Sequence, residues 1–305
     1  MNVFFEKGVG KLQGKWRVWE LKVRWSIEKF NMKVLCFGSL NIDKATQSIQ
    51  EERANQAVAL ARAAPSDLAI HHAGQVGTDG KMAHRLVEPE QYQHIRCLVS
   101  QNRKHGLRFD PKGLSGDNAI ILLPAANCKI PLQHIDETLS KFDAGDWLLV
   151  QNEINNINDI IRKAKARGMQ VAFNPAPCPP IILSYSLECV DVLVLNEGEA
   201  EMLYSAITQK KAAPEEGASA LQRGSEITNI PALRDCRVVD TTGAGDTFVG
   251  FFLATFASLQ QKKEGGAFKN ALKVAAIASG MTCETHGATP SIPLMKDVQK
   301  RMLQQ

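Results

Sequence analysis

Short apolar runs alternate with segments of helical hydrophobic spacing along most of the chain. Nearly continuous apolar strands are typical of a parallel sheet that helices cover on both faces. We therefore predict an α/β fold in three layers, with a mostly parallel central sheet between two layers of helices. The expected strands are 34–38, 68–76, 118–123, 147–150, 170–174 and 190–195, and the expected helices are 54–63, 81–87, 132–142, 154–167, 197–205 and a long one from 243.

The first 31 residues follow a different pattern. Apolar residues from Trp19 to Ile27 alternate with polar ones, which is the two-residue period of a half-buried strand. An import signal would be rich in Arg and Ser, poor in acidic residues and amphipathic as a helix, which does not describe this stretch. We expect an N-terminal extension at 1–31 without a function of its own, followed by one domain at 32–305.

The net charge of the chain comes from the same extension. Residues 1–30 hold seven basic and three acidic side chains, which accounts for the whole formal charge of +4. The rest of the chain therefore lacks the basic footprint of a nucleic-acid-binding protein. No apolar run approaches the roughly 18–20 residues that a membrane span needs. We expect neither nucleic acid nor a membrane as a partner.

The seven cysteines are odd in number and scattered, and no two of them have the Cys-x-x-Cys spacing. This usage is typical of reduced thiols in a cytosol-like compartment. Most of them lie in apolar contexts such as 34–37, which favours small buried side chains over nucleophiles. We expect the protein in the cytoplasm, with the nucleus as a second compartment.

A glycine-rich loop between a strand and an apolar helix carries the clearest chemistry. The sequence from Asp240 to Asp246 reads Asp-Thr-Thr-Gly-Ala-Gly-Asp, and the apolar residues 248–256 follow. The amides at the start of that helix point outward without acceptors, and together with the helix dipole they favour an anion. Asp246 lies among them, where a carboxylate can take the proton of an attacking hydroxyl. A base beside a charge-stabilising hole is what phosphoryl transfer needs.

The same residues have a simpler interpretation as a helix cap, because Asp and Thr commonly begin helices. Other phosphate-binding loops do not fit. The P-loop requires Gly-Lys-Ser/Thr, and the dinucleotide fingerprint requires a third glycine three residues after Gly245, where Phe248 stands.

The loop resembles the C-terminal signature of the ribokinase family of carbohydrate kinases, Asp-Thr-x-Gly-Ala-Gly-Asp, and the similarity extends from about 33 to 293. The resemblance implies the three-layer ribokinase-like fold and transfer of phosphate from ATP to a sugar. It implies that Asp246 is the catalytic base. The nucleotide phosphates would meet Gly243, Ala244, Gly245 and Asp246.

Four further segments resemble the sugar side of the family. Gly38–Asp43 is similar to its first strand and turn, Ala54–Ala59 to the helix after its sugar loop, Gln151–Glu153 to a strand end that reaches the sugar, and Asn174–Pro177 to another strand end. A short carboxylate such as Asp43 can accept hydrogen bonds from two neighbouring hydroxyls. The resemblance implies a substrate-binding set of Asn41, Asp43, Asn55, Glu153 and Asp246.

Cation sites also follow from the resemblance. Asn196–Glu199 is similar to an Asn-x-x-Glu element in which Asn196 faces nucleotide phosphates and Glu199 orders Mg²⁺ through water, although the same spacing is common at helix starts. A single carboxylate suffices because Mg²⁺ keeps several waters. The segment 287–293 is similar to the closing motif that holds a monovalent cation. The implied K⁺ set is Asp240, Thr242, Thr282, Thr285, Gly287 and Ser291.

Two segments depart from the family pattern. Only residues 44–54 stand where the family has a small β lid and a Gly-Gly-Lys-Gly sugar loop, and residues 50–53 read Gln-Glu-Glu-Arg. We therefore expect the lid to be absent or truncated, with weakened sugar binding and turnover. Between 202 and 227 a buried strand and a nucleotide loop are missing, so either 217–221 pairs again or the sheet is damaged. Residues 86–117 also align poorly.

The sequence thus favours an ATP-dependent ribokinase that converts D-ribose to ribose 5-phosphate with Mg²⁺ and activating K⁺. The second hypothesis is a catalytically impaired relative that binds nucleotide or a partner. A third is a kinase of the same family that acts on another sugar or a nucleoside. Dimers of the family are built from the lid sheet, so the absence of a lid argues against that dimer.

Overall fold

The computed structural model describes residues 11–12, 15–16, 32–45, 48–77, 94–99, 106–109, 121–123, 125–208, 218–220, 228–230, 233 and 235–304. Of these, it describes the backbone alone for 11–12, 15–16, 41–45, 48–53, 94–99, 106–109, 121–123, 208, 218–220 and 228–229. The chain divides into two units, residues 1–31 and 32–305. In the first unit, β1 (Lys11–Leu12) pairs antiparallel with β2 (Lys15–Trp16). The strand expected around 19–27 lies outside the described residues.

The second unit is built on a six-stranded sheet in the order β12-β11-β10-β3-β6-β7. Every neighbouring pair in this sheet is parallel, which confirms the predicted parallel sheet. The carboxyl ends of its strands therefore lie along one edge, where ligands of such sheets bind. The strands are β3 (Met32–Phe37), β6 (Leu68–Val76), β7 (His94–Val99), β10 (Trp147–Gln151), β11 (Gln170–Asn174) and β12 (Val192–Leu193).

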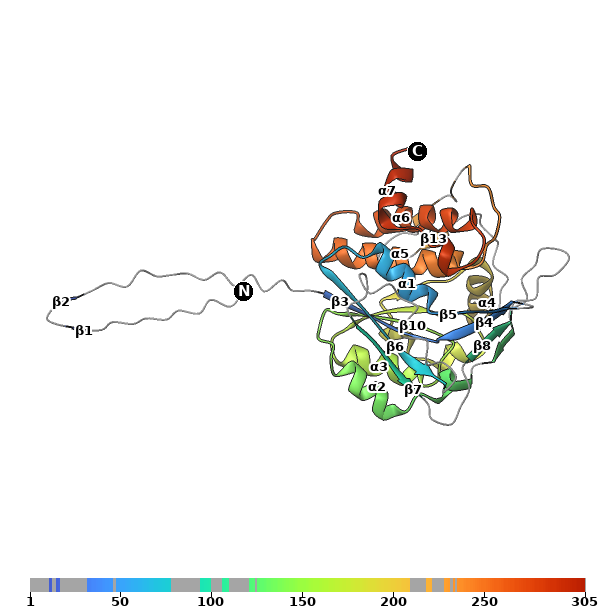
Figure 1. Ribbon diagram of the computed structural model, residues 1–305. Coiled ribbons are helices and arrows are strands. Elements are labelled where there is room, and N and C mark those ends of the chain that lie inside the picture. The colour runs from blue at the N-terminus through green and yellow to red at the C-terminus, as the bar shows by residue number, and fades with distance from the viewer. Residues whose placement is uncertain are drawn as a thin grey trace. The chain divides into compact units, whose positions relative to one another are not determined.

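Helices cover both faces of this sheet, as the strand pattern predicted (Figure 1). The apolar run of the central strand β10 is continuous because its alternate side chains are buried on the two faces of the sheet. Trp147 and Leu149 belong to the core under one group of helices, and Leu148 and Val150 belong to the core under the other. The first group is α1 (Asn55–Ala63), α5 (Ala244–Gln261) and α6 (Ala267–Cys283), on which α7 (Met295–Met302) packs, and the second is α2 (Leu132–Leu139) and α3 (Ile157–Ala166).

Helices α1 and α5 make a close contact at Gly250 of α5, which lies against Ala59 and Leu60 of α1. A Cβ atom added to Gly250 would lie 2.4 Å from the Cβ atom of Ala59 and 2.7 Å from the backbone nitrogen of Leu60. Real Cβ atoms do not approach other atoms so closely, so only glycine permits this separation of the two helices. The close contact fixes the starts of α1 and α5 with respect to each other.

A second, smaller sheet decides between an absent and a truncated lid. Its four strands run in the order β5-β4-β8-β9, and β4 pairs antiparallel with β5 from Asn41 and Arg53 to Ala45 and Ser48. Antiparallel strands need only a short connection. A short form of the lid sheet is therefore present, and residues 50–53 lie in a strand. The strands are β4 (Asn41–Ala45), β5 (Ser48–Arg53), β8 (Gly106–Phe109) and β9 (Ile121–Leu123).

The presence of the smaller sheet affects two further expectations, on the stretch 86–117 and on the dimer. Strand β8 lies in the poorly aligned stretch 86–117, where no strand was expected, whereas β9 falls within the expected strand 118–123 but belongs to the smaller sheet. The argument against a dimer rested on the absence of this sheet, and that argument falls with it.

The two sheets are joined through Asn127. This buried residue lies in the short helix η2 (Ala125–Lys129), which follows β9. Its side-chain amide forms two hydrogen bonds with the backbone of Leu40, just before β4. The amide of Leu40 donates to Oδ1 of Asn127 at 3.1 Å, and Nδ2 of Asn127 donates to the carbonyl of Leu40 at 3.2 Å. The first entry of the chain into the smaller sheet, before β4, and its last exit, after β9, are thus fastened together.

The other departure from the family pattern lies beyond β12. Strand β13 (Ala218–Ala220) pairs antiparallel with β14 (Thr228–Ile230) in a separate two-stranded sheet. The segment therefore does pair, as one of the two expectations held, but outside the central sheet. Within the described residues, β12 forms the edge of the central sheet next to α4 (Glu197–Thr208).

Among the helices that the structure describes, none has the length and apolar character needed to cross a bilayer.

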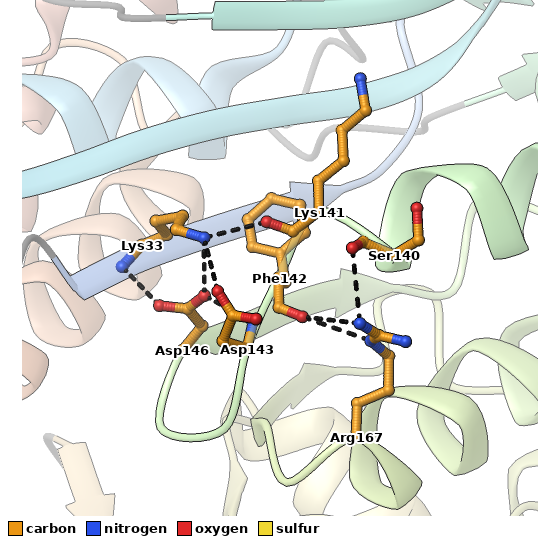
Figure 2. A network of polar contacts seen from close by, with 7 residues as sticks. All are labelled: Lys33, Ser140, Lys141, Phe142, Asp143, Asp146 and Arg167. Carbon is orange, nitrogen blue, oxygen red and sulfur yellow. Dashed lines mark hydrogen bonds and ion pairs between the residues drawn. The ribbon is translucent and has the colours of Figure 1, made fainter.

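A polar network closes the amino-terminal end of the central sheet (Figure 2). The carboxylate of Asp146 accepts hydrogen bonds from the backbone amides of Lys33 and Asp143, both at 2.9 Å, and its Oδ2 lies 3.4 Å from Nζ of Lys33. Nζ of Lys33 also donates to the carbonyl of Lys141 at 2.9 Å. The network ties β3 to the loop before β10, at the end of the strands opposite to the ligand-binding edge.

Replacing Asp146 by Asn is expected to destabilise the fold by about 1–2 kcal/mol. The new amide group would face the amide of Asp143 and the ammonium group of Lys33, and a buried donor would then lack an acceptor. Thermal unfolding measures the change. Asp136→Asn is the matched control, because Asp136 forms an exposed ion pair with Lys163 and such pairs contribute little. Equal unfolding midpoints for both variants would contradict the prediction.

Candidate functional site

Asp246 lies in the first turn of α5, at the carboxyl-terminal edge of the central sheet. Gly243, which precedes the helix, has a φ of 83°, a left-handed conformation that glycine adopts without strain. The side chain of Asp246 is half-buried, so it is not turned into the core. This placement is the one that the sequence predicted for the base.

The amides of this loop are mostly available to an anion. Among the described residues, the amides of Gly243, Gly245 and Asp246 meet no protein acceptor, whereas that of Ala244 donates to the carbonyl of Thr241 at 3.2 Å. One of the four predicted phosphate-facing amides is therefore already used. The other three keep the open geometry of a helix start.

Two consecutive side chains of α1 hold the carboxylate of Asp246. Nδ2 of Asn55 donates to Oδ2 at 3.1 Å, and Nε2 of Gln56 donates to Oδ1 at 3.0 Å. Each carboxylate oxygen thus receives one amide hydrogen bond and retains lone pairs for a further proton or donor.

These amides are themselves held by groups from other elements. The hydroxyl of Thr289 donates to Oδ1 of Asn55 at 2.8 Å, and Nε2 of Gln56 also donates to Oδ1 of Asn174, again at 2.8 Å. Nδ2 of Asn174 donates to the carbonyl of Val194 at 2.9 Å. The ends of β11 and β12 are therefore connected to Asp246 through side-chain amides.

Burial changes the pKa of two paired residues of the central strands β3 and β6, Cys36 and His72. Burial, and secondarily the charge of Asp246, raises the pKa of the Cys36 thiol to about 12, so this cysteine is a thiol at neutral pH and no nucleophile. Burial lowers the pKa of His72 to about 4, so the imidazole is neutral there. For Cys36 the structure agrees with the expectation of a buried, unreactive residue.

The other residues of the predicted substrate set lie in both sheets. Glu153 follows β10 and is half-buried, and it accepts a hydrogen bond from the hydroxyl of Ser39, which follows β3. Asn41 and Asp43 lie in β4, in the smaller sheet, and their side chains lie outside the described part. Asn55 and Glu153 thus lie at the carboxyl-terminal edge of the central sheet, whereas Asn41 and Asp43 belong to the smaller sheet.

Asn196 and Glu199 cap the start of α4. The amide of Asn196 donates to Oε2 of Glu199 at 2.9 Å, and the amide of Glu199 donates to Oδ1 of Asn196 at 2.8 Å. This reciprocal pair is a capping box, the simple helix-start interpretation of Asn-x-x-Glu. Burial raises the pKa of Glu199, and the hydrogen bond from Asn196 partly offsets this. Oε1 of Glu199 takes no hydrogen bond from the described residues.

The residues of the implied K⁺ set fall into two groups. Asp240 joins two loops, because its Oδ1 accepts from the amide and hydroxyl of Thr242 and its Oδ2 accepts from the amide of Gly287 at 3.1 Å. Thr282 instead lies between helices, where its hydroxyl oxygen is 3.0 Å from the hydroxyl of Thr247 and 3.1 Å from the carbonyl of Ala278, and it can donate its one hydrogen to either.

The other two members lie in the closing segment. The amide of Thr285 meets the carbonyl of Thr282 at 3.4 Å, and the hydroxyl of Ser291 donates to the carbonyl of Ala288 at 2.7 Å. In the described residues no three His, Cys, Asp or Glu side chains gather as metal ligands. Oxygen atoms of the backbone and of single side chains are thus the groups available to cations.

Residues 52–295, more than half of the chain, match the pfkB family of carbohydrate kinases. The chain belongs to this family. As a pfkB family member it is an ATP-dependent carbohydrate kinase, and the sequence resemblance to the ribokinase group is confirmed.

The relatives of this pfkB protein include several ribokinases. It is 26% identical to the ribokinase of Staphylococcus aureus, with 88% of this chain and 99% of that protein covered. It is 27% identical to the ribokinase of Schizosaccharomyces pombe, with 80% and 83% covered. The similarity therefore extends over nearly the full length of the domain.

Solved structures have the same fold. The ribokinase of Cryptococcus neoformans in complex with ADP superimposes with a TM-score of 0.72 at 24% identity, over 89% of this chain and 99% of that one. The Arabidopsis thaliana ribokinase complexed with ribose and ATP gives 0.69 at 22% identity, over 88% and 98%. These comparisons confirm the predicted three-layer fold.

Sequence reasoning missed three residues of the hydrogen-bond network around Asp246: Gln56, Asn174 and Thr289. Gln56 and Asn174 stood in segments that resemble the family, yet neither was given a role. The positions of Gln56 and Asn174 in the predicted elements could have identified them. Gln56 adjoins Asn55 at a helix start, and Asn174 ends a parallel strand, so both face the edge where the base lies.

Proposed function

We propose that this pfkB family member is a ribokinase, which transfers the γ-phosphoryl group of ATP to the primary hydroxyl of D-ribose and forms ribose 5-phosphate. One observation carries the proposal. The carboxylate of Asp246 is held by Asn55 and Gln56 directly beside backbone amides that meet no protein acceptor among the described residues. The relatives named ribokinase, and a neighbour solved with ribose and ATP, support ribose as the substrate.

In the proposed reaction Asp246 takes the proton of the sugar hydroxyl as its oxygen attacks the phosphoryl group. General-base assistance of this kind contributes about 10²–10⁴ in rate. The amides of Gly243, Gly245 and Asp246 would stabilise the negative charge that develops on the phosphoryl oxygens. Asn41, Asp43, Asn55 and Glu153 would hold the other sugar hydroxyls, and Asn196 would face the nucleotide phosphates.

The oxygen donors of the site fit the expected cations. Glu199 keeps one carboxylate oxygen without a donor from the described part of the chain, which suits Mg²⁺ that retains its waters. A bound Mg²⁺ would neutralise charge on the phosphates. For K⁺ we propose Asp240, Thr242, Thr282, Thr285, Gly287 and Ser291, mainly through carbonyl oxygens.

On the cysteine pattern we further propose the cytoplasm as the place of the reaction.

The test is a transfer assay with the purified chain, ATP, Mg²⁺ and K⁺, in which mass spectrometry detects the sugar phosphate. Ribose is compared with fructose, adenosine and a pyrimidine nucleoside. We expect ribose 5-phosphate as the main product. Phosphorylation of another compound without ribose turnover would overturn the substrate assignment and retain the kinase.

A second candidate function is nucleotide binding without transfer. The edge position of β12 and the separate pairing of β13 and β14 favour impaired transfer, because among the described residues no strand continues the central sheet beyond β12, where the family has one. Thermal unfolding with and without ATP and ribose distinguishes the two, since a ligand that binds the native state raises the midpoint. A rise with ATP in a chain that forms no sugar phosphate would favour this candidate.

A further inference from the structure

Gln56 makes two donor contacts that give it a position between the base and the sheet. Its Nε2 donates to Oδ1 of Asp246 at 3.0 Å and to Oδ1 of Asn174 at 2.8 Å. Both hydrogens of the side-chain amide are therefore used, one on each side. The contacts join α1 to α5 and to the end of β11.

The orientation of this amide follows from its neighbours. Nδ2 of Asn174 is committed to the carbonyl of Val194, so the oxygen of Asn174 faces Gln56 and requires a donor. The carboxylate of Asp246 likewise requires a donor. A reversed Gln56 would place its oxygen against two acceptors at once, so the nitrogen faces them.

The burial of Gln56 also indicates that its amide serves as a hydrogen-bond donor. Gln56 is 3% exposed, and its Oε1 is buried without a hydrogen-bond partner among the described residues. A buried polar atom without a partner costs about 1–3 kcal/mol. An apolar side chain of similar length would avoid this cost. The amide therefore has its use in the two hydrogen bonds that it donates.

We propose that Gln56 is a positioning residue for the base. It fixes the rotation of the Asp246 carboxylate and couples it to the ends of β11 and β12. Because Val194 stands two residues before Asn196, the same chain of amides connects the base to the strand end that leads to the nucleotide side. This inference rests on the proposed kinase function and adds a residue to it.

The first test replaces Gln56 by Met, which keeps the length and removes both donors. We expect kcat to fall about 10- to 100-fold, since small misplacements of reacting groups have effects of this size. The KM for ATP should stay within about twofold of the wild type. Gln260→Met is the matched control: Oε1 of Gln260 is also buried without a partner in the described structure, and Gln260 lies at the end of α5 opposite to Asp246. Its kcat should be unchanged.

The second test is Gln56→Glu, which keeps the shape of the side chain but places an acceptor against two acceptors. When protonated, the introduced carboxyl group can donate one hydrogen bond again, so the activity relative to wild type should recover as the pH falls. A purely structural role would lower activity and folded fraction together and leave the shape of the pH profile unchanged. That outcome, or a kcat for Gln56→Met within twofold of wild type, would overturn the proposal.

A crystal structure of Gln56→Met tests the same inference without turnover. We expect the carboxylate of Asp246 to rotate away from its wild-type orientation, while Asn55 keeps its contact with Thr289. An unchanged carboxylate would overturn the positioning role even if the chain phosphorylates ribose. A rotated carboxylate in a chain without any kinase activity would support the positioning of Asp246 and refute the proposed function instead.

Discussion

Asp246→Asn is expected to lower kcat for ribose phosphorylation by about 10²–10⁴-fold. The asparagine has the shape of the aspartate but cannot take the proton of the attacking hydroxyl. It also places an amide group against Asn55 or Gln56, which both donate to the carboxylate in the native protein. The measurement is the rate of ADP release that depends on added ribose.

The matched control is Asp297→Asn, the same chemical change on the far helix α7, where the carboxylate forms an ion pair with Lys300. The control should keep wild-type kcat, and both variants should unfold near the wild-type temperature. If Asp246→Asn retains more than a tenth of the wild-type kcat, Asp246 is not the base.

Gly250→Ala is expected to destabilise the domain by about 3 kcal/mol, the upper end for overpacked cores. The added methyl group would lie 2.4 Å from the Cβ atom of Ala59 and 2.7 Å from the backbone nitrogen of Leu60, so α1 and α5 must move apart. The unfolding midpoint should fall by roughly 5–10 °C. Activity should fall as well, because the donors of α1 would withdraw from Asp246.

Gly265→Ala is the control for this substitution, since a Cβ atom at Gly265 would meet no atom within 4 Å. Its midpoint should stay close to that of the wild type. A Gly250→Ala protein as stable as the control would show that the two helices can separate without loss, contrary to the packing argument.

Much of the fold could be predicted from hydrophobic pattern alone. The expected strands 68–76 and 170–174 coincide with β6 and β11, because fully buried parallel strands leave long apolar runs. The position of Asp246 was also predictable. A glycine turn before an apolar helix dictates local geometry, and the amides around Asp246 follow from it.

The smaller sheet could not be predicted in the same way. Only β9 falls within an expected strand, 118–123. The pairing of β4 with β8, more than sixty residues later, leaves no local signal in the sequence. The support of the base was hidden for a similar reason. The contact between Gln56 and Asp246 joins residues 190 positions apart and depends on how α1 packs against α5. The Asn-x-x-Glu spacing at Asn196 and Glu199, in contrast, is explained by a local interaction, because the two residues form a capping box at the start of one helix.

The fastening of Leu40 to Asn127 limits how the smaller sheet can move. The chain crosses between the two sheets before β4, after β5, before β8 and after β9, and the two hydrogen bonds tie the first of these crossings to the last. Asn41 lies directly after the tied crossing, while Ala45 lies at the far end of β4, about 13 Å away at ~3.3 Å per residue. A displacement of the smaller sheet should therefore move Asn41 less than Ala45.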